Sequence, residues 1–229
     1  MTEAAPAPNT WPHLDPLARR VLGMLIEKAK TTPDNYPLSL NALVAGCNQK
    51  NNRDPVMNLV DAEVDEAMNR LKQLGYAQQI LGSGRVDKFR HVVYEAWRVG
   101  KEELAILGEL LLRGPQTEGE LRGRASRMEP LPDLEALRTH LQHLASRGLV
   151  VYLGPAGRRG TLITHGFLSP EEQEQLARGV PAAGPPTPAP ATATGSTPLS
   201  ERIDRLEGEV RDLRDAVARL AARLERQSG

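Results

Sequence analysis

One pattern of residues occurs twice along this chain of 229 residues, and it restricts the fold more than any other feature. The segment VLGMLI at 21–26 matches ILGELL at 106–111, and LKQLGY at 71–76 matches LASRGL at 144–149. An internal repeat of this kind indicates two copies of one structural unit. The offset between the copies shrinks from 85 residues (106 − 21) to 73 (144 − 71), so the first copy is longer by 12. Most of that excess precedes its third helix.

Each copy is predicted to contain three helices followed by a β-hairpin. Asp15-Pro16 is typical of a helix start, because Asp is a favoured N-cap and Pro a favoured first residue. Thr117 and Glu120 have the spacing of a capping box at the start of another helix. The remaining elements follow from apolar periodicity and from glycine turns. In the first copy we expect helices beginning at Asp15 and Ser39 and spanning 61–74, then strands 77–81 and 86–94. In the second we expect helices at 102–113, from Thr117 and at 133–147, then strands 149–153 and 161–164.

Three helices and a hairpin are the order of a winged-helix unit. The sequence therefore predicts a mostly α fold with small β-hairpins (α+β), made of two tandem winged-helix domains and a C-terminal coiled-coil helix. A generic all-α chain with accidental self-similarity is the alternative. The expected segments are a disordered N-terminus (1–13), winged-helix domains at 14–98 and 99–179, a Pro/Ala/Thr linker at 180–198 and a coiled coil at 199–227.

The C-terminal segment has a regular heptad pattern. Its apolar residues alternate in spacings of four and three, with mostly β-branched residues at one core position and leucine at the other, which favours a parallel two-stranded coil. We therefore expect a homodimer. A single amphipathic helix that folds back on the winged-helix domains is the alternative. The predicted dimerisation residues are Leu199, Ile203, Leu206, Val210, Leu213, Val217, Leu220 and Leu224.

Composition excludes several classes of function. Lys and Arg together number 29, as do Asp and Glu, so any nucleic-acid binding must come from local clusters. The single cysteine, Cys47, permits neither an intrachain disulfide nor a Cys-rich zinc site. No signal peptide or membrane span is recognisable, so a soluble cytoplasmic protein is expected. No catalytic motif or cofactor site is present, and His140 and His143 are too few for a metal, so we expect a binding protein and not an enzyme.

Basic residues gather where a winged helix meets phosphates, in both hairpins and in the loop before the first copy's third helix. The nucleic-acid-binding candidates are Lys50, Asn52, Arg53, Arg85, Lys88, Arg90, Arg158 and Arg159. The acidic run DAEVDE at 61–66 argues against simple DNA reading, because phosphates would repel a third helix that begins in this way. Two hypotheses follow: a nucleic-acid-binding or transcription-regulator-like protein, or a protein-interaction module.

The segment NQKNNRDPV at 48–56, with LD at 14–15, EK at 27–28 and GSGRV at 82–86, resembles the YceH family of bacterial proteins. The resemblance covers about residues 12–175. It implies tandem winged helices, and it supplies no activity, substrate or catalytic residue.

Overall fold

A computed structural model describes residues 11–81 and 86–179. These residues belong to one compact unit, Met1–Pro181. The predicted linker (180–198) and coiled coil (199–227), and most of the predicted disordered N-terminus, lie outside the described residues.

The first repeat has the predicted order of elements. The Asp15 carboxylate accepts a hydrogen bond from Ala18 N at 2.8 Å, and the Ser39 hydroxyl caps the second helix in the same way. Its elements are α1 (Pro16–Thr31), η1 (Pro33–Asn35), α2 (Leu40–Cys47), α3 (Asp61–Gln73), β1 (Ala77–Leu81) and β2 (Asp87–His91).

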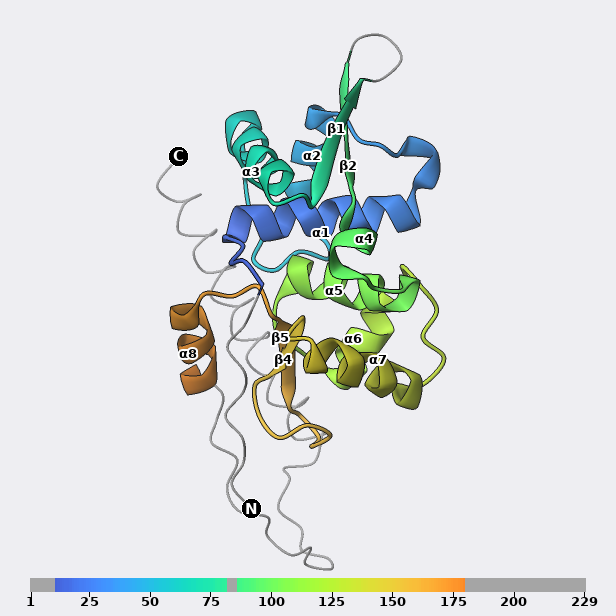
Figure 1. Cartoon of the computed structure of the whole chain (residues 1–229), viewed down its shortest axis with the longest axis vertical. Helices are drawn as coiled ribbons and strands as arrows, with labels where there is room; N and C mark the ends of the chain where they lie inside the picture. Colours follow the sequence, from blue (N-terminus) through green and yellow to red (C-terminus); the bar gives the residue numbers. More distant parts are fainter. Residues whose placement is uncertain (1–10, 82–85, 180–229) are drawn as a thin grey trace, which may run out of the picture. The chain divides into compact units, whose positions relative to one another are not determined.

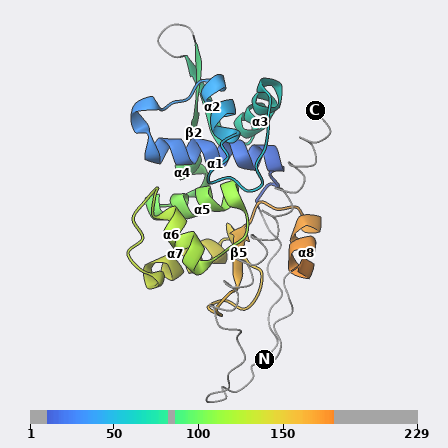
Figure 2. The same cartoon turned by 180° about the vertical axis from the view of Figure 1, so that it is seen from behind.

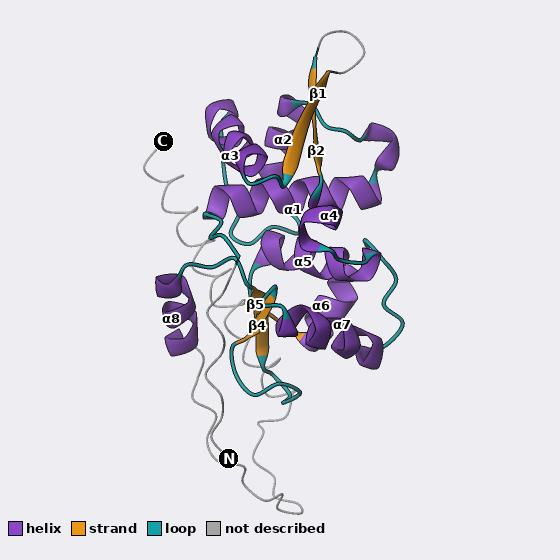
Figure 3. Cartoon of the chain, viewed as in Figure 1, coloured by secondary structure: helices purple, strands orange, loops and turns teal. Residues whose placement is uncertain are grey.

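A short helix, α4 (Val93–Trp97), connects the two repeats, and the second repeat has the same order of elements. Thr117 and Glu120 form the predicted capping box, in which the Glu120 carboxylate accepts from Thr117 N at 3.1 Å. The elements are α5 (Lys101–Arg113), β3 (Gln116–Thr117), α6 (Glu118–Ala125), α7 (Leu134–Ser146), β4 (Val150–Tyr152), β5 (Leu162–His165) and α8 (Pro170–Gly179). Figure 3 shows the helices around the two small antiparallel sheets.

Two details differ from the sequence prediction. The strand expected at 86–94 ends at His91, and Val93–Trp97 is helical. Val93 and Trp97 are four residues apart and both buried, which suits one face of a helix. The second sheet also has a third strand, because β3 pairs with β5. The first repeat has the same feature in reduced form, a bridge between Leu38 and Phe89. A strand this short has no periodicity to detect.

The two repeats pack against each other through α1 and α5, which lie side by side in both views (Figures 1 and 2). The matching glycines of the repeat lie at this contact. A Cβ on Gly23 would lie 2.8 Å from Leu112 Cγ, and a Cβ on Gly108 would lie 2.7 Å from Ile26 Cγ2. The repeated sequence therefore supplies a close contact between helices, and one continuous core runs through both repeats.

The hairpins extend in opposite directions from this shared core. In Figure 1, β1 and β2 point away from the second repeat, and β4 and β5 point away from the first. Aromatic side chains hold the chain between the hairpin bases: the rings of Trp97 and Phe167 stack with centroids 4.8 Å apart, and Tyr76 meets Trp97 edge-on at 5.3 Å. The two hairpins therefore present separate surfaces.

Candidate nucleic-acid interface

A groove in the second repeat lies between the start of α6, the start of α7 and the β4–β5 loop. Its volume is about 520 Å³. Gly119 of α6, Leu134 of α7 and the segment 157–161 of the hairpin loop contribute to its walls. The groove thus joins the third helix of the second repeat to its hairpin loop, and that loop carries two of the predicted nucleic-acid-binding residues.

Arg158 and Arg159 lie on the hairpin side of the groove, and both are exposed. Their loop is held by its own hydrogen bonds: Arg158 N donates to Pro155 O at 3.3 Å, and Thr161 Oγ1 donates to the same oxygen at 2.8 Å. The two arginines are therefore carried by a defined loop and stand next to the cavity.

Arg138 contributes the third positive charge of the groove from α7. Its Nε and one terminal nitrogen donate to Glu118 Oε2 at 3.0 and 2.9 Å. The hydrogen bond with Glu118 raises the pKa of Arg138. Three arginines and one glutamate line the groove, so its lining carries an excess of two positive charges.

The hairpin of the first repeat offers less to an anion. Arg90 is exposed, but its guanidinium donates to Gln78 Oε1 on the neighbouring strand at 2.9 and 3.3 Å. Lys88 is half-buried, and Arg85 lies outside the described residues. The tip is flanked by apolar side chains, with Leu81 82% and Val86 54% exposed.

The loop before α3 places its predicted residues in different environments. Lys50 is exposed, and Asn52 is half-buried with a left-handed backbone (φ 58°). Arg53 corrects the prediction, because it is only 4% exposed and cannot reach a phosphate on the surface. Its guanidinium donates to Glu27 Oε2 at 2.6 Å, to Gly46 O at 3.1 Å and to Gln49 Oε1 at 3.1 Å.

Arg53 therefore anchors the loop internally, and its neighbours do the same. The Asn48 side chain donates to Leu59 O at 2.8 Å and accepts from Leu59 N at 2.7 Å, which closes the loop at its base. Asp54 N donates to Leu112 O at 3.1 Å, which ties the loop to α5 of the second repeat. The distinctive 48–56 segment thus has a structural role that charge alone did not reveal.

The third helices of the two repeats differ in charge. On α3, Asp61, Asp65 and Glu66 are all exposed, as the acidic run predicted. On α7, Asp133 caps the helix by accepting from Ala136 N at 2.8 Å, and Arg138 follows one turn later. The second repeat is therefore the better candidate for contact with an anionic partner.

Other predicted features have simpler environments. The His143 ring lies against Glu103 of α5, and His140 is half-buried on the same helix. Within 11–81 and 86–179, three or more metal-binding side chains do not come together anywhere. The same residues include no helix with the length and apolar character needed to cross a membrane. The eight dimerisation residues, from Leu199 to Leu224, lie outside the described residues.

Sequence reasoning missed three residues of the groove, Glu118, Leu134 and Arg138. Glu118 and Leu134 are the first residues of α6 and α7, and Leu134 is 38% exposed. The signal for both was their position at a helix start, where side chains of the first turn face the neighbouring loop.

The fold defines a class: an α-rich protein built from two helix–hairpin repeats around a shared core. The chain belongs to a family whose model, described as "Protein of unknown function, DUF480", matches residues 14–158. This agrees with the resemblance that residues 48–56 carry.

Proteins named UPF0502 are similar over most of the chain. One from Rhodopirellula baltica is 45% identical over 90% of this chain and 91% of its own length. Another, from Koribacter versatilis, is 44% identical over 87% of this chain and 90% of its own. A third, from Geotalea uraniireducens, is 45% identical over 86% and 89%.

Proposed function

We propose that the chain is a non-enzymatic binding protein with two tandem winged-helix units, and that the second unit binds duplex nucleic acid. One observation carries the proposal: Arg158 and Arg159 are exposed beside a groove that the start of α7 also lines. In helix-turn-helix proteins the third helix enters the groove of the duplex, and basic side chains of neighbouring segments meet the phosphates.

The contrast with the first unit supports this choice. The exposed acids of α3 would repel phosphates. The surplus of positive charge in the groove of the second unit attracts them instead.

The proposed binding is mainly to the backbone of the duplex and not to a particular sequence. Arg158 and Arg159 are on a loop, and the first turn of α7 carries the acidic Asp133 and Glu135. Phosphate contacts position a protein and give affinity that depends strongly on salt, whereas base contacts specify sequence. Weak, salt-sensitive binding with little sequence preference is therefore expected.

A salt titration of binding to a random duplex tests the proposal. Each phosphate contact contributes a slope of about −0.9 to the log–log dependence of affinity on salt. The double variant Arg158→Ala/Arg159→Ala should reduce the slope by about 2. The matched variant Lys88→Ala/Arg90→Ala removes the same charge from the first hairpin and should leave the slope unchanged. Equal slopes for both variants, or no binding at about 50 mM salt, would contradict the proposal.

Dimerisation through residues 199–227 would strengthen such binding, because two linked copies bind the same duplex with avidity. We propose that the leucine-rich heptads form a parallel homodimer. Sedimentation of the full chain should show a dimer at high concentration, and Leu206→Pro/Leu213→Pro should leave a monomer with weaker DNA binding.

Protein docking is the second candidate function, and the tip of the first hairpin favours it. Leu81 at the end of β1 and Val86 just before β2 are strongly exposed for apolar side chains. A protein captured from native extract treated with nuclease should then be lost with Leu81→Ser/Val86→Ser. It should be retained with Val60→Ser, which changes a side chain of similar exposure (58%) before α3.

A further inference from the structure

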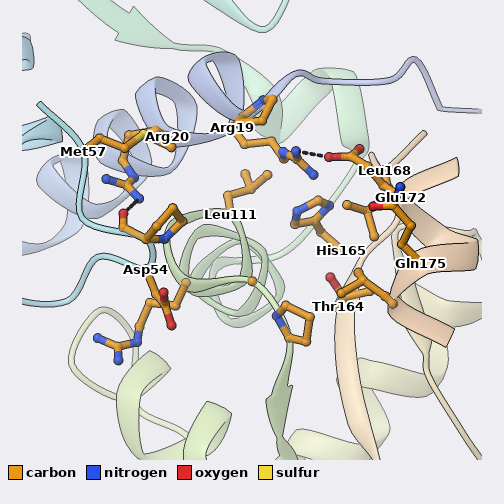
Figure 4. Close-up of a pocket in the computed structure, with 16 residues that line it drawn as sticks. Arg19, Arg20, Asp54, Met57, Leu111, Thr164, His165, Leu168, Glu172 and Gln175 are labelled. Atoms are coloured by element: carbon orange, nitrogen blue, oxygen red, sulfur yellow. Dashed lines mark hydrogen bonds and ion pairs between the residues drawn. The ribbon is translucent and has the colours of Figure 1, made fainter. Parts of the chain in front are cut away.

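A second cavity of about 520 Å³ lies where the two repeats and the last helix meet. Its walls come from the start of α1, the 54–57 loop, the end of α5, β5 and α8. It shares no lining residue with the groove beside Arg158. Figure 4 shows Arg19 and Arg20 on one side, Thr164 and His165 on the other, and Leu111 between them.

Arg20 brings a positive charge to this cavity without an acidic partner. Its side chain is 1% exposed, and its terminal nitrogens donate to two neutral carbonyls, Cys47 O at 3.0 Å and Pro55 O at 2.5 Å. Its Nε has no hydrogen-bond partner, and among the described residues no carboxylate oxygen lies within 4.0 Å. Burial lowers the pKa of Arg20. A buried cation whose hydrogen bonds go only to neutral carbonyls would be stabilised by an anion.

Thr164 provides a second unused polar group. Its residue is fully buried, and its hydroxyl has no partner within the described parts of the chain. In Figure 4 the hydroxyl oxygen points toward the cavity. Buried hydroxyls in folded proteins are almost always hydrogen-bonded, so an unpaired one facing a cavity indicates a ligand group that would complete it.

The neighbouring charges are already paired or absent. Arg19 and Glu172 form an ion pair at 2.5 Å that joins α1 to α8. Burial lowers the pKa of His165 to about 3, so its ring is neutral near pH 7. Arg113 lies 3.9 Å from the buried Glu109 outside the lining, and Asp54 is exposed, so the buried positive charge without an acidic partner is that of Arg20. One negative charge on a ligand would balance it.

The rest of the lining is apolar. Met57, Leu111, Leu168 and Leu176 come from four different segments and surround the polar groups. A cavity of this size with a few polar groups in an apolar wall is typical of small-molecule sites.

We propose that this cavity binds a small organic monoanion, a carboxylate attached to an apolar body of medium length. The carboxylate would be held near the Arg20 guanidinium, the apolar body would cover Leu111 and Leu168, and Thr164 would donate its hydroxyl hydrogen to a ligand oxygen. The site ties α1 and the 54–57 loop to β5 and α8, so a ligand there would bridge both repeats.

Octanoate is a suitable probe, and calorimetric titration of the full-length protein is the measurement. Binding should saturate at one equivalent with a dissociation constant below about 1 mM. Two matched probes separate the contributions: 1-octanol keeps the chain without the charge, and acetate keeps the charge without the chain. Both should bind at least about tenfold more weakly, since each lacks one of the two interactions.

Substitutions of residues that line the cavity test whether octanoate binds there. Thr164→Val should weaken octanoate about three- to tenfold, the loss of one hydrogen bond, without lowering the melting temperature, because the hydroxyl is unpaired in the free protein. Thr139→Val makes the same change on an exposed face of α7 and should leave the affinity unchanged. Leu176→Trp should block the cavity from α8 while leaving the first repeat intact. Arg20→Gln should cost at least about tenfold in affinity.

The outcomes are decisive in both directions. Saturable binding that Thr164→Val and Leu176→Trp weaken supports the site. No saturable octanoate binding up to about 10 mM overturns it. Binding that both variants leave unchanged, or octanol binding as tight as octanoate, also overturns it. Because the DNA variants lie in the other cavity, failure here leaves the proposed nucleic-acid function standing, and the reverse also holds.

Discussion

The two repeats share the same arrangement of helices and hairpin, and they differ in their loops. Both begin with a capped helix that carries a glycine at the α1–α5 contact, and in both the return strand of the hairpin ends at a histidine, His91 or His165. The first repeat has a long loop, held by Arg53, before its third helix. The second joins α6 to α7 by the shorter segment 126–133 and carries arginines at its hairpin loop. The shared features lie inside and the differing features at loops, which indicates a common fold adapted to separate surfaces.

The locked loop is the largest internal difference, and breaking it should have the largest effect. Arg53→Ala or Glu27→Ala would leave one partner of a buried ion pair (side chains 0% and 5% exposed) without compensation. The free energy of unfolding should fall by about 3–5 kcal/mol in either variant, measured by urea denaturation.

Two further variants control this prediction. Lys50→Ala removes an exposed charge from the same loop and should change stability by less than about 0.5 kcal/mol. The pair Glu27→Met/Arg53→Met replaces both charges with apolar side chains and should be milder than either single change. Single variants as stable as Lys50→Ala would show that the loop does not depend on this ion pair.

The glycines at the α1–α5 contact test the shared arrangement. Gly108→Val places a Cβ 2.7 Å from Ile26 Cγ2, and Gly23→Val places one 2.8 Å from Leu112 Cγ. Each should cost about 1–3 kcal/mol by overpacking, since one contact surface serves both repeats. Gly123→Ala on α6 adds a methyl group with nothing within 4 Å and should not destabilise the protein. If only one of the two valine variants is destabilised, the contact is not equivalent in the two repeats.

His91 and His165 occupy equivalent positions in the two repeats, and the pH dependence of stability tests whether both rings are buried in the neutral form. Burial lowers the pKa of His165 to about 3 and that of His91 to about 4, from an ordinary value of 6.5. The unfolded chain therefore takes up these protons first, so stability is lost as pH falls below 6.5. At pH 5 each histidine should account for about 2 kcal/mol of the loss.

Denaturation curves of His165→Gln and His91→Gln from pH 7 down to about pH 3 measure these losses. Each variant should show a shallower fall in unfolding free energy than the parent protein. The groups near His165 are Arg19, Glu172 and His13, and those near His91 are Lys30 and Arg90. Below pH 4 the contribution of His91 should stop growing while that of His165 continues. Parallel curves for parent and variants would show that neither ring is held neutral.

Local signals in the sequence predicted the helices and hairpins well. They did not predict contacts between residues that are far apart in the sequence. Asp15, Ser39 and Thr117 define helix starts because a cap depends on residues three positions away. Arg53 was assigned to the surface because nothing within its loop shows that its partner is Glu27, on another helix. The repeated segments 21–26 and 106–111 were recognised in the sequence, but their packing against each other in α1 and α5 was not predicted. Neither cavity could be predicted, because each combines segments distant in sequence.

The smallest expected effect concerns a position where the matched segments differ, Met24 in the first and Glu109 in the second. Glu109 is fully buried; Arg127 lies 3.3 Å from Oε2, whereas Oε1 has no hydrogen-bond partner and lies 3.9 Å from Arg113. Burial raises the pKa of Glu109, so its charge destabilises the folded state above that pKa, and the penalty disappears as pH falls through it.

Glu109→Met copies the residue of the first repeat into the second and should remove this penalty. The Arg127 side chain is 39% exposed and can be hydrated after the change, and Arg113 Nε makes no hydrogen bond that the change would break. Stability near pH 7 should therefore be unchanged or higher by up to about 1 kcal/mol, with the gain shrinking in acid. Glu109→Ala is the control, because it removes the charge but leaves a cavity and should be destabilised at every pH. If Glu109→Met lost as much stability as Arg53→Ala, Glu109 would be a structural ion-pair partner like Glu27, and the two repeats would be more alike than their contacts indicate.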